Sequence, residues 1–172
     1  MNALILAAGY GSRIKHITKK TPKCLIEVRK NHAIIDVWIN KLLQSGIDKI
    51  FINTHYKANV VNKYISKKYG SRIKIFHEPK LLGTSKTVLK NKNQICDTDC
   101  IILHADNFAP YINLKKIISY FFYSRETADV IILGFKTNDF HNSGILKINK
   151  FKKLVKINEK LNFKTGNIAN GA

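Results

Sequence analysis

Short apolar runs alternate along this chain with longer segments whose apolar residues recur at helical spacing, and this alternation restricts the folds that are open to it. Ala3–Ala8 and Cys100–His104 are apolar runs typical of buried strands. Ile34–Ser45 places its apolar residues on one helical face, and Gly46 follows as a helix terminator. The pattern predicts an α/β fold, a doubly wound, mostly parallel Rossmann-like sheet with helices on both faces.

The full set of expected elements follows the same alternation. The predicted strands are Ala3–Ala8, Lys49–Asn53, Ile73–Phe76, Cys100–His104 and Ala128–Phe135, and the predicted helices are Ile34–Ser45, Ala58–Lys68, Thr84–Gln94 and Leu114–Tyr123. After Gly144 the pattern changes to the short strands Ile145–Ile148 and Leu154–Ile157, which we expect to extend the sheet. Because no repeat, low-complexity segment or linker interrupts the 172 residues, we expect a single domain over 1–172.

The composition is that of a globular protein with an unusually basic surface. Apolar residues make up 45% of the chain, and 30 Lys and Arg against 11 Asp and Glu give a net charge of +19. The lysines are spread from end to end, which favours a solvated surface, although any polyanion would be attracted to it. Since the sequence has no aromatic-basic stacking motif or recognition-helix pattern, we expect no specific nucleic-acid partner.

Cysteines and apolar segments indicate the compartment. Cys24, Cys96 and Cys100 have neither disulfide-framework nor metal-ligand spacing. No apolar run reaches the roughly 18 residues that span a membrane, and the first run lacks the preceding basic residues of a signal peptide. We therefore expect a cytoplasmic protein without a membrane partner.

The most specific local feature is the turn after the first strand. Ala3–Ala8 leads into Gly9-Tyr10-Gly11-Ser12-Arg13, and Lys23 follows ten residues after Arg13. Glycines allow the backbone N–H groups to approach an oxyanion, and two cations lie nearby. Asp106 follows the strand Cys100–His104, so it should lie at the same edge of the sheet, where such folds bind ligands. These residues predict a binding site for a polyphosphate.

Each of these residues also has an ordinary structural interpretation. Gly9 and Gly11 fit a tight strand-to-helix turn, Lys23 a solvated surface lysine, and Asp106 a helix N-cap or turn residue. Ile14 stands where the dinucleotide fingerprint G-x-G-x-x-G has its third glycine, and no phosphate loop of the G-x-x-x-x-G-K-[ST] type is present.

A family resemblance extends over essentially the whole chain. The residues that carry it are Leu6-Ala7-Ala8-Gly9-Tyr10-Gly11-Ser12-Arg13, Thr18 or Thr21, Pro22-Lys23-Cys24-Leu25, Trp38 with Gly46-Ile47, Asn53-Thr54-His55-Tyr56, Leu82-Gly83-Thr84, His104-Ala105-Asp106-Asn107, Ser143-Gly144-Ile145, Glu159-Lys160 and Gly166-Asn167-Ile168-Ala169-Asn170. In this order they resemble the sugar-phosphate nucleotidyltransferases, and especially their mannose-1-phosphate guanylyltransferase-like branch. The resemblance implies transfer of a nucleotidyl group from a nucleoside triphosphate to a sugar 1-phosphate, with release of pyrophosphate, to make an NDP-sugar for polysaccharide or glycoconjugate synthesis.

The resemblance also implies roles for individual residues. Arg13 would hold the departing pyrophosphate, Lys23 would stabilise charge on the α-phosphate, and Asp106 would bind Mg²⁺. The nucleotide would be bound by Leu6, Ala7, Ala8, Gly9, Gly11, Ser12 and the base-recognition turn at Gly83 and Thr84. A plain helix start is the alternative interpretation of Gly83-Thr84.

Four further positions match the sugar side of the family's site: Gly144, Glu159, Lys160 and Asn170. Glu159 would accept hydrogen bonds from sugar hydroxyls, and Lys160 would meet the sugar phosphate. The family usually has proline next, whereas this chain has Leu161-Asn162-Phe163. A surface ion pair is therefore the alternative for Glu159 and Lys160.

Members of the family continue beyond the position of Ala172, and the resemblance places a second metal-binding aspartate in that later part. We therefore expect a fragment, a truncated gene product or a shortened relative. Relatives often self-associate, so a homo-oligomer is one expectation. Two other functions remain open: a CTP-dependent cytidylyltransferase acting on a phosphorylated alcohol such as phosphocholine, and a catalytically silent nucleotide-binding relative. The sequence does not fix the nucleobase or the sugar.

Overall fold

The structure, a computed structural model, describes residues 1–47, 49–139, 141, 143–158 and 168–170. It divides into two compact units, residues 1–117 and 118–172. The helix α5 (Leu114–Tyr123) spans the boundary between them.

The first unit is built on a four-stranded sheet in the order β5-β4-β1-β6, with every neighbouring pair parallel. Its strands are β1 (Asn2–Leu6), β4 (Ile50–Thr54), β5 (Ile73–His77) and β6 (Cys100–His104). Leu6 pairs with Asn53 on one side and with His104 on the other. Three strands therefore end together at one edge of the sheet.

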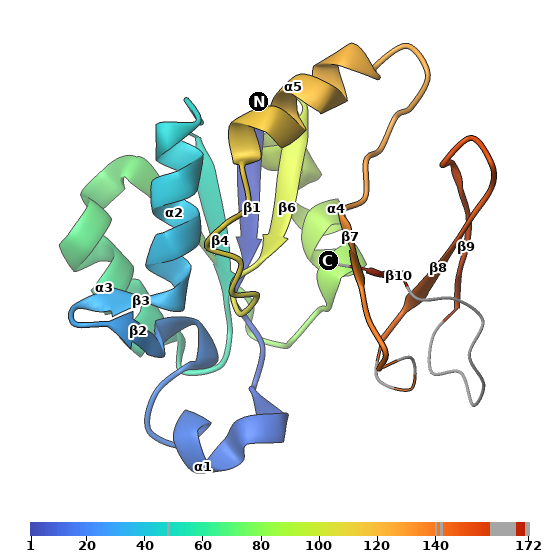
Figure 1. Cartoon of the computed structure of the whole chain (residues 1–172). Coiled ribbons are helices and arrows are strands. Elements are labelled where there is room, and N and C mark those ends of the chain that lie inside the picture. Colours follow the sequence, from blue (N-terminus) through green and yellow to red (C-terminus); the bar gives the residue numbers. More distant parts are fainter. Residues whose placement is uncertain (48, 140, 142, 159–167, 171–172) are drawn as a thin grey trace. The chain divides into compact units, whose positions relative to one another are not determined.

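Helices lie on both faces of this sheet, as the alternation predicts (Figure 1). The connections through α2 (Ile34–Gln44) and α3 (Ala58–Tyr69) step outward from β1 to β5, whereas the connection through α4 (Thr84–Ile95) returns across the sheet to β6. Because such crossovers are right-handed, the change of direction puts α4 on the opposite face from α2 and α3.

The core reflects the alternating directions of strand side chains. Leu4, Phe51 and Ile95 are fully buried and pack together, which places α4 over the face that Leu4 presents. Ile5 and Ile52, the next residues along two of these strands, are fully buried on the other face, where α2 and α3 lie. A sheet covered on both faces needs the continuous apolar strands that the sequence contains.

The segment between β1 and α2 is folded from short elements. It contains η1 (Ser12–Ile14), α1 (Lys15–Thr18), η2 (Lys23–Leu25) and a hairpin of β2 (Glu27–Arg29) and β3 (His32–Ala33). A further one-turn helix, η3 (Gly70–Arg72), joins α3 to β5.

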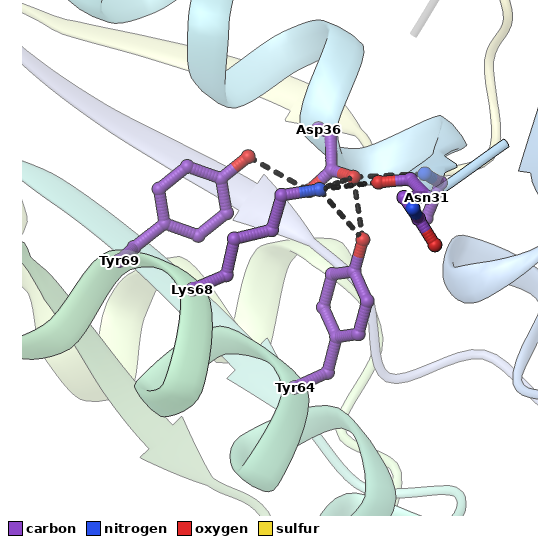
Figure 2. A network of polar contacts seen from close by, with 6 residues as sticks. Asn31, Asp36, Tyr64, Lys68 and Tyr69 are labelled. Carbon is purple, nitrogen blue, oxygen red and sulfur yellow. Dashed lines mark hydrogen bonds and ion pairs between the residues drawn. The ribbon is translucent and has the colours of Figure 1, made fainter. Parts of the chain in front are cut away.

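A polar cluster fixes the hairpin to the helices (Figure 2). The buried carboxyl group of Asp36 accepts hydrogen bonds from Tyr64 at 2.5 Å, Tyr69 at 2.7 Å and the Ala33 backbone N–H at 2.8 Å, and it pairs with the Lys68 ammonium at 2.6 Å. Lys68 also donates to the backbone carbonyl of Asn31 at 2.8 Å. We call Asp36, Tyr64, Lys68 and Tyr69 the Asp36 cluster.

The pKa of Asp36 reports the balance inside this cluster. Burial raises the pKa, but the hydrogen bonds from Lys68, the two tyrosines and Ala33 together outweigh it, so the pKa of Asp36 lies below its ordinary 3.8. Burial likewise acts against the charge of Lys68, yet Asp36 and Tyr64 hold the pKa of Lys68 above its ordinary value. Folding therefore favours the charged forms of both groups.

The second unit holds a separate sheet in the order β7-β10-β8-β9, whose paired strands are antiparallel. Its strands are β7 (Gly134–Lys136), β8 (Ile145–Ile148), β9 (Leu154–Asn158) and β10 (Ile168–Asn170). The last two predicted strands therefore form, but the expectation that they extend the parallel sheet is wrong.

Two predicted strands differ from the observed ones by two residues or more at an end, whereas the others agree to within one residue. The first ends at Leu6 because the Ala7 N–H donates to the Asn53 side chain at 2.8 Å and so leaves the strand ladder. Of Ala128–Phe135, only Gly134 and Phe135 join a strand, where they pair with β10. An apolar run indicates burial but does not supply a strand partner. Residues 128–133 pair with no strand in the described part of the chain.

No helix in the described part of the chain combines the length and the apolar character needed to cross a membrane.

Candidate nucleotide site

A cavity of about 380 Å³ lies at the edge of the first unit where β1, β4 and β6 end. This volume falls within the range of small-molecule sites. All eleven residues predicted to bind nucleotide or to act in catalysis line it: Leu6, Ala7, Ala8, Gly9, Gly11, Ser12, Arg13, Lys23, Gly83, Thr84 and Asp106. The structure thus brings together residues that are up to 100 positions apart, while their individual roles remain predictions.

The two glycines of the loop have different structural requirements. Gly11 has a φ of +64°, and an added Cβ would lie 2.6 Å from the Thr18 methyl group. The Thr18 hydroxyl donates to the carbonyls of Gly11 at 3.2 Å and Ile14 at 3.3 Å, which fixes this turn. A Cβ on Gly9 would meet open space. Gly11 is therefore required by the fold, whereas Gly9 leaves room beside the cavity.

The loop also presents unpaired backbone donors. Within the described residues, the N–H groups of Gly9 and Gly11 donate no hydrogen bond to another backbone group. Buried or ligand-facing N–H groups need a partner, and an oxyanion can supply it. The loop is therefore suited to bind a phosphate group.

Charged side chains from separate elements meet at this cavity. The Lys23 ammonium, from η2, forms an ion pair with the Asp106 carboxylate, which follows β6, and both side chains are partly exposed. Arg13 is exposed beside them and has no ion-pair partner in the described part of the chain. The charges of Lys23 and Asp106 cancel, so Arg13 gives the cavity one net positive charge. A polyphosphate site requires such positive charge.

The Asp106 turn is held from two directions. The Ala105 N–H donates to the Leu6 carbonyl at 3.0 Å, which continues the pairing of β6 with β1. The Trp38 indole N–H, from α2, donates to the Asn107 carbonyl at 2.7 Å. These bonds fix the backbone on both sides of Asp106 and so define where its carboxylate can lie.

Gly83 and Thr84 form the start of α4 on the cavity wall. Gly83 has a φ of +80°, and its carbonyl accepts the first helical bond, from the Thr87 N–H at 3.0 Å. The predicted plain helix start is thus present, and the same two residues also face the cavity. The two interpretations of this turn are compatible.

Cys24 also lines the cavity, but it is unsuited to act as a nucleophile. Burial raises the pKa of its thiol to about 12, with a smaller contribution from the Asp106 charge. A protonated, buried thiol is inert. The three cysteines are free, in agreement with the absence of a disulfide pattern in the sequence.

A metal ion would find one carboxylate in this cavity. The described residues contain no group of three or more His, Cys, Asp or Glu side chains that could hold a metal ion. Mg²⁺, however, is commonly bound through one or two carboxylates together with substrate phosphates. The partly exposed Asp106, on the lining of the cavity, fits that mode of binding.

The predicted sugar-side residues lie elsewhere in the chain. Gly144 directly precedes β8, and Asn170 ends β10, both in the second unit. Glu159 and Lys160 lie outside the described residues. The sugar-side roles of all four therefore remain predictions.

No role was predicted from the sequence for a group of buried polar residues next to the cavity, although Asn53 is among the residues that carry the family resemblance. Asn53 lines the cavity and, with Glu78 and Thr87, is almost completely buried. Asn53 lies near the end of β4, and Glu78 follows β5 directly, so both lie at the edge where ligands bind. A polar residue at the end of a buried strand is the signal that could have identified them.

Comparison with known proteins agrees with this geometry. Residues 2–172 match the model of the nucleotidyl transferase family. Along 99% of its length the chain is 27% identical to a D-glycero-alpha-D-manno-heptose 1-phosphate guanylyltransferase from Campylobacter jejuni and covers 73% of that relative. It is also 46% identical to a CTP:phosphoglutamine cytidylyltransferase from the same organism over 67 residues. This aligned region covers 39% of this chain and 26% of the relative.

Other relatives are longer than this chain, and solved structures share its fold. A mannose-1-phosphate guanyltransferase from Yarrowia lipolytica is 27% identical over 88% of the chain, which spans less than half (44%) of that relative. The structure of a Bacillus anthracis protein described as a glucose-1-phosphate thymidylyltransferase has a TM-score of 0.83 at 23% identity, covering 99% of this chain and 68% of that one. The match of residues 2–172 to the family model shows that the chain belongs to the nucleotidyl transferase family.

Proposed function

We propose that this chain binds a nucleoside triphosphate in the cavity and transfers its nucleoside monophosphate to a sugar 1-phosphate, giving an NDP-sugar and pyrophosphate. The observation that carries the proposal is the meeting of the glycine loop, Arg13, Lys23 and Asp106 around one cavity. The guanylyltransferase relatives that match along most of the chain support a sugar 1-phosphate as the acceptor.

The reaction needs positioning and charge neutralisation more than proton transfer. An oxygen of the acceptor phosphate attacks the α-phosphorus, a new P–O bond forms, and the bond to the β-phosphate oxygen breaks as pyrophosphate leaves. The attacking phosphate is already anionic, so no general base is required. Preorganised cations and N–H donors lower the barrier because they meet charge as it develops.

Each group at the cavity has a part in this scheme. The N–H groups of Gly9 and Gly11 bind triphosphate oxygens, and the Arg13 guanidinium holds the departing pyrophosphate with a bidentate grip. Lys23 places a point charge on the α-phosphate. Asp106 would hold Mg²⁺ together with the phosphates; when bound, the ion neutralises phosphate charge as a Lewis acid. Lys23 must leave Asp106 for both roles to be filled.

The test is pyrophosphate release. The purified chain, with Mg²⁺, is offered each of ATP, GTP, CTP, UTP and dTTP in combination with a panel of sugar 1-phosphates, and pyrophosphate is measured with a coupled assay. We expect release with one nucleotide and one acceptor class. If no combination releases pyrophosphate although a nucleotide binds, the chain is a nucleotide-binding relative without activity, and the proposal is wrong.

A second acceptor class deserves a place in the same panel. The 46% identity to a CTP:phosphoglutamine cytidylyltransferase, over a short region, favours CTP with a phosphorylated acceptor that is not a sugar. Phosphocholine and a phosphorylated amide represent this class. Turnover with CTP and one of these, and with no sugar 1-phosphate, would replace the leading proposal with this one.

A further inference from the structure

We propose that Glu78 is a positioning residue that fixes the turn before α4 for nucleoside binding. The inference rests on the proposed function, and it concerns a buried group that the reaction scheme does not use. Glu78 is 1% exposed, and it does not line the cavity. Its effect on a ligand must therefore pass through the residues that it holds.

The carboxyl group of Glu78 is surrounded by donors. Its Oε1 accepts from the Thr87 hydroxyl at 2.5 Å and from the Asn53 side-chain amide at 2.9 Å, and its Oε2 accepts from the Leu82 backbone N–H at 3.2 Å. The described residues place no Lys or Arg ion-pair partner on it. A buried acidic group without a cation is costly, so these donors are needed to keep it in place.

The three donors come from different parts of the chain: Asn53 from β4, Leu82 from the segment between β5 and α4, and Thr87 from α4. Asn53 accepts the Ala7 N–H at 2.8 Å, so it ties Glu78 to the loop that follows β1. Leu82 lies between Leu81 and Gly83, and both of these line the cavity. Thr87 belongs to α4 and does not line it. One carboxyl group thus joins the phosphate side of the cavity to the turn at Gly83.

The main chain of Glu78 is anchored as firmly as its side chain. Its N–H donates to the Thr54 carbonyl at 2.8 Å, and its carbonyl is bonded to the His55 ring at 2.8 Å, whose other nitrogen meets the Tyr10 hydroxyl at 2.8 Å. With Glu78 held in this way, the 3.2 Å bond from the Leu82 N–H ties the segment 79–83 to it. That segment includes Gly83, which has a φ of +80° and lines the cavity.

Glu78→Gln isolates this one bond. Glutamine has the same volume as glutamate and keeps one side-chain oxygen, which can still accept from Asn53 and Thr87. Its NH₂ group then faces the Leu82 N–H, and two donors cannot bond each other. Thr87→Val is the matched control because it removes another bond to the same carboxyl group, made by a residue that does not line the cavity. Comparing the two separates positioning of the turn from stability of the network.

The experiment measures dissociation constants by calorimetry with the full chain. The probes are the five nucleoside triphosphates with Mg²⁺ and, separately, inorganic tripolyphosphate. Tripolyphosphate has no nucleoside, so it tests only the phosphate-binding part of the cavity. For the nucleotide that the wild type binds most tightly, we expect Glu78→Gln to raise Kd about tenfold, the effect of one lost buried hydrogen bond. The tripolyphosphate Kd should not change, and Thr87→Val should change neither value.

Each alternative outcome has a distinct meaning. If the wild type binds none of the five nucleotides, the proposed function fails and this inference fails with it. If the wild type binds one and Glu78→Gln binds it equally well, the inference alone is overturned. Hydrogen exchange provides a test without a variant: the Leu82 amide should be protected in the wild type, and exchange at the rate of an open loop would also overturn the inference.

Discussion

The cavity edge and the Asp36 cluster are both polar regions of the first unit, yet they differ in how far their polar groups are paired. In the Asp36 cluster one carboxylate accepts bonds from two tyrosines, a lysine and a backbone N–H. At the cavity the described residues leave Arg13 and the N–H groups of Gly9 and Gly11 without partners. Paired groups stabilise the fold, whereas unpaired groups remain available to a ligand.

The largest expected effect tests the paired region. Asp36→Ala leaves Lys68, Tyr64 and Tyr69 without their shared acceptor, and breaking a buried pair costs about 3–5 kcal/mol of unfolding free energy. Urea unfolding followed by circular dichroism measures the loss, with the exposed Asp129→Ala as control. Nucleotide affinity of the folded protein should not change. If Asp36→Ala loses nucleotide affinity but keeps its unfolding free energy, the Asp36 cluster serves ligand binding rather than the fold, and the comparison is wrong.

Arg13→Ala tests the unpaired region. Because Arg13 is exposed and has no ion-pair partner in the described part of the chain, its loss should leave the melting temperature unchanged. Turnover should fall by about 100-fold, which is about 2.7 kcal/mol of transition-state stabilisation. Arg29→Ala, which removes an exposed arginine on the β2–β3 hairpin, should keep full turnover. Equal turnover of the two variants would remove Arg13 from the mechanism.

The two loop glycines sharpen the contrast within one turn. Gly11→Ala must adopt a left-handed conformation against the Thr18 methyl group, so we expect it to lose about 1–2 kcal/mol of stability. Gly9→Ala meets open space and should keep its stability, but the added methyl lies where a phosphate would approach, so nucleotide binding should weaken. Melting curves and calorimetric titration of both variants measure the two effects. Equal behaviour of the two variants would contradict this division.

The smallest expected effect is a pH dependence of the paired region. The pKa of Asp36 is lowered in the folded state, so its contribution to stability is present above pH 3.8 and is lost as pH falls through the folded value. The difference in unfolding free energy between the wild type and Asp36→Asn should therefore be constant near neutrality and narrow below pH 3.8. A difference that widens in acid would contradict the direction of the pKa shift.

Much of the first unit could be predicted because its strands and helices each carry their own local signal. Cys100–His104 and Leu114–Tyr123 have the predicted bounds. The gathering of Arg13, Lys23 and Asp106 could also be predicted, since the carboxyl ends of parallel strands share one edge. In such cases local pattern and topology point to the same answer.

The remaining features depend on contacts between distant residues. Ala7 leaves the first strand because of the Asn53 side chain, and the run after Ala128 forms a strand only at Gly134 and Phe135, where β10 supplies the pairing. The Asp36 cluster joins residues about 30 positions apart that have no spacing rule in common. No single-segment pattern contains this information.

The close approach of Gly11 to Thr18 restricts how this loop can change in evolution. A side chain at position 11 and a methyl group at position 18 compete for the same space, so substitutions at the two positions are epistatic. Serine at position 18 would retain the hydroxyl that donates to the Gly11 and Ile14 carbonyls while removing the methyl. A lineage that acquires Thr18→Ser first thereby becomes more permissive at position 11, whereas the reverse order passes through a less stable intermediate.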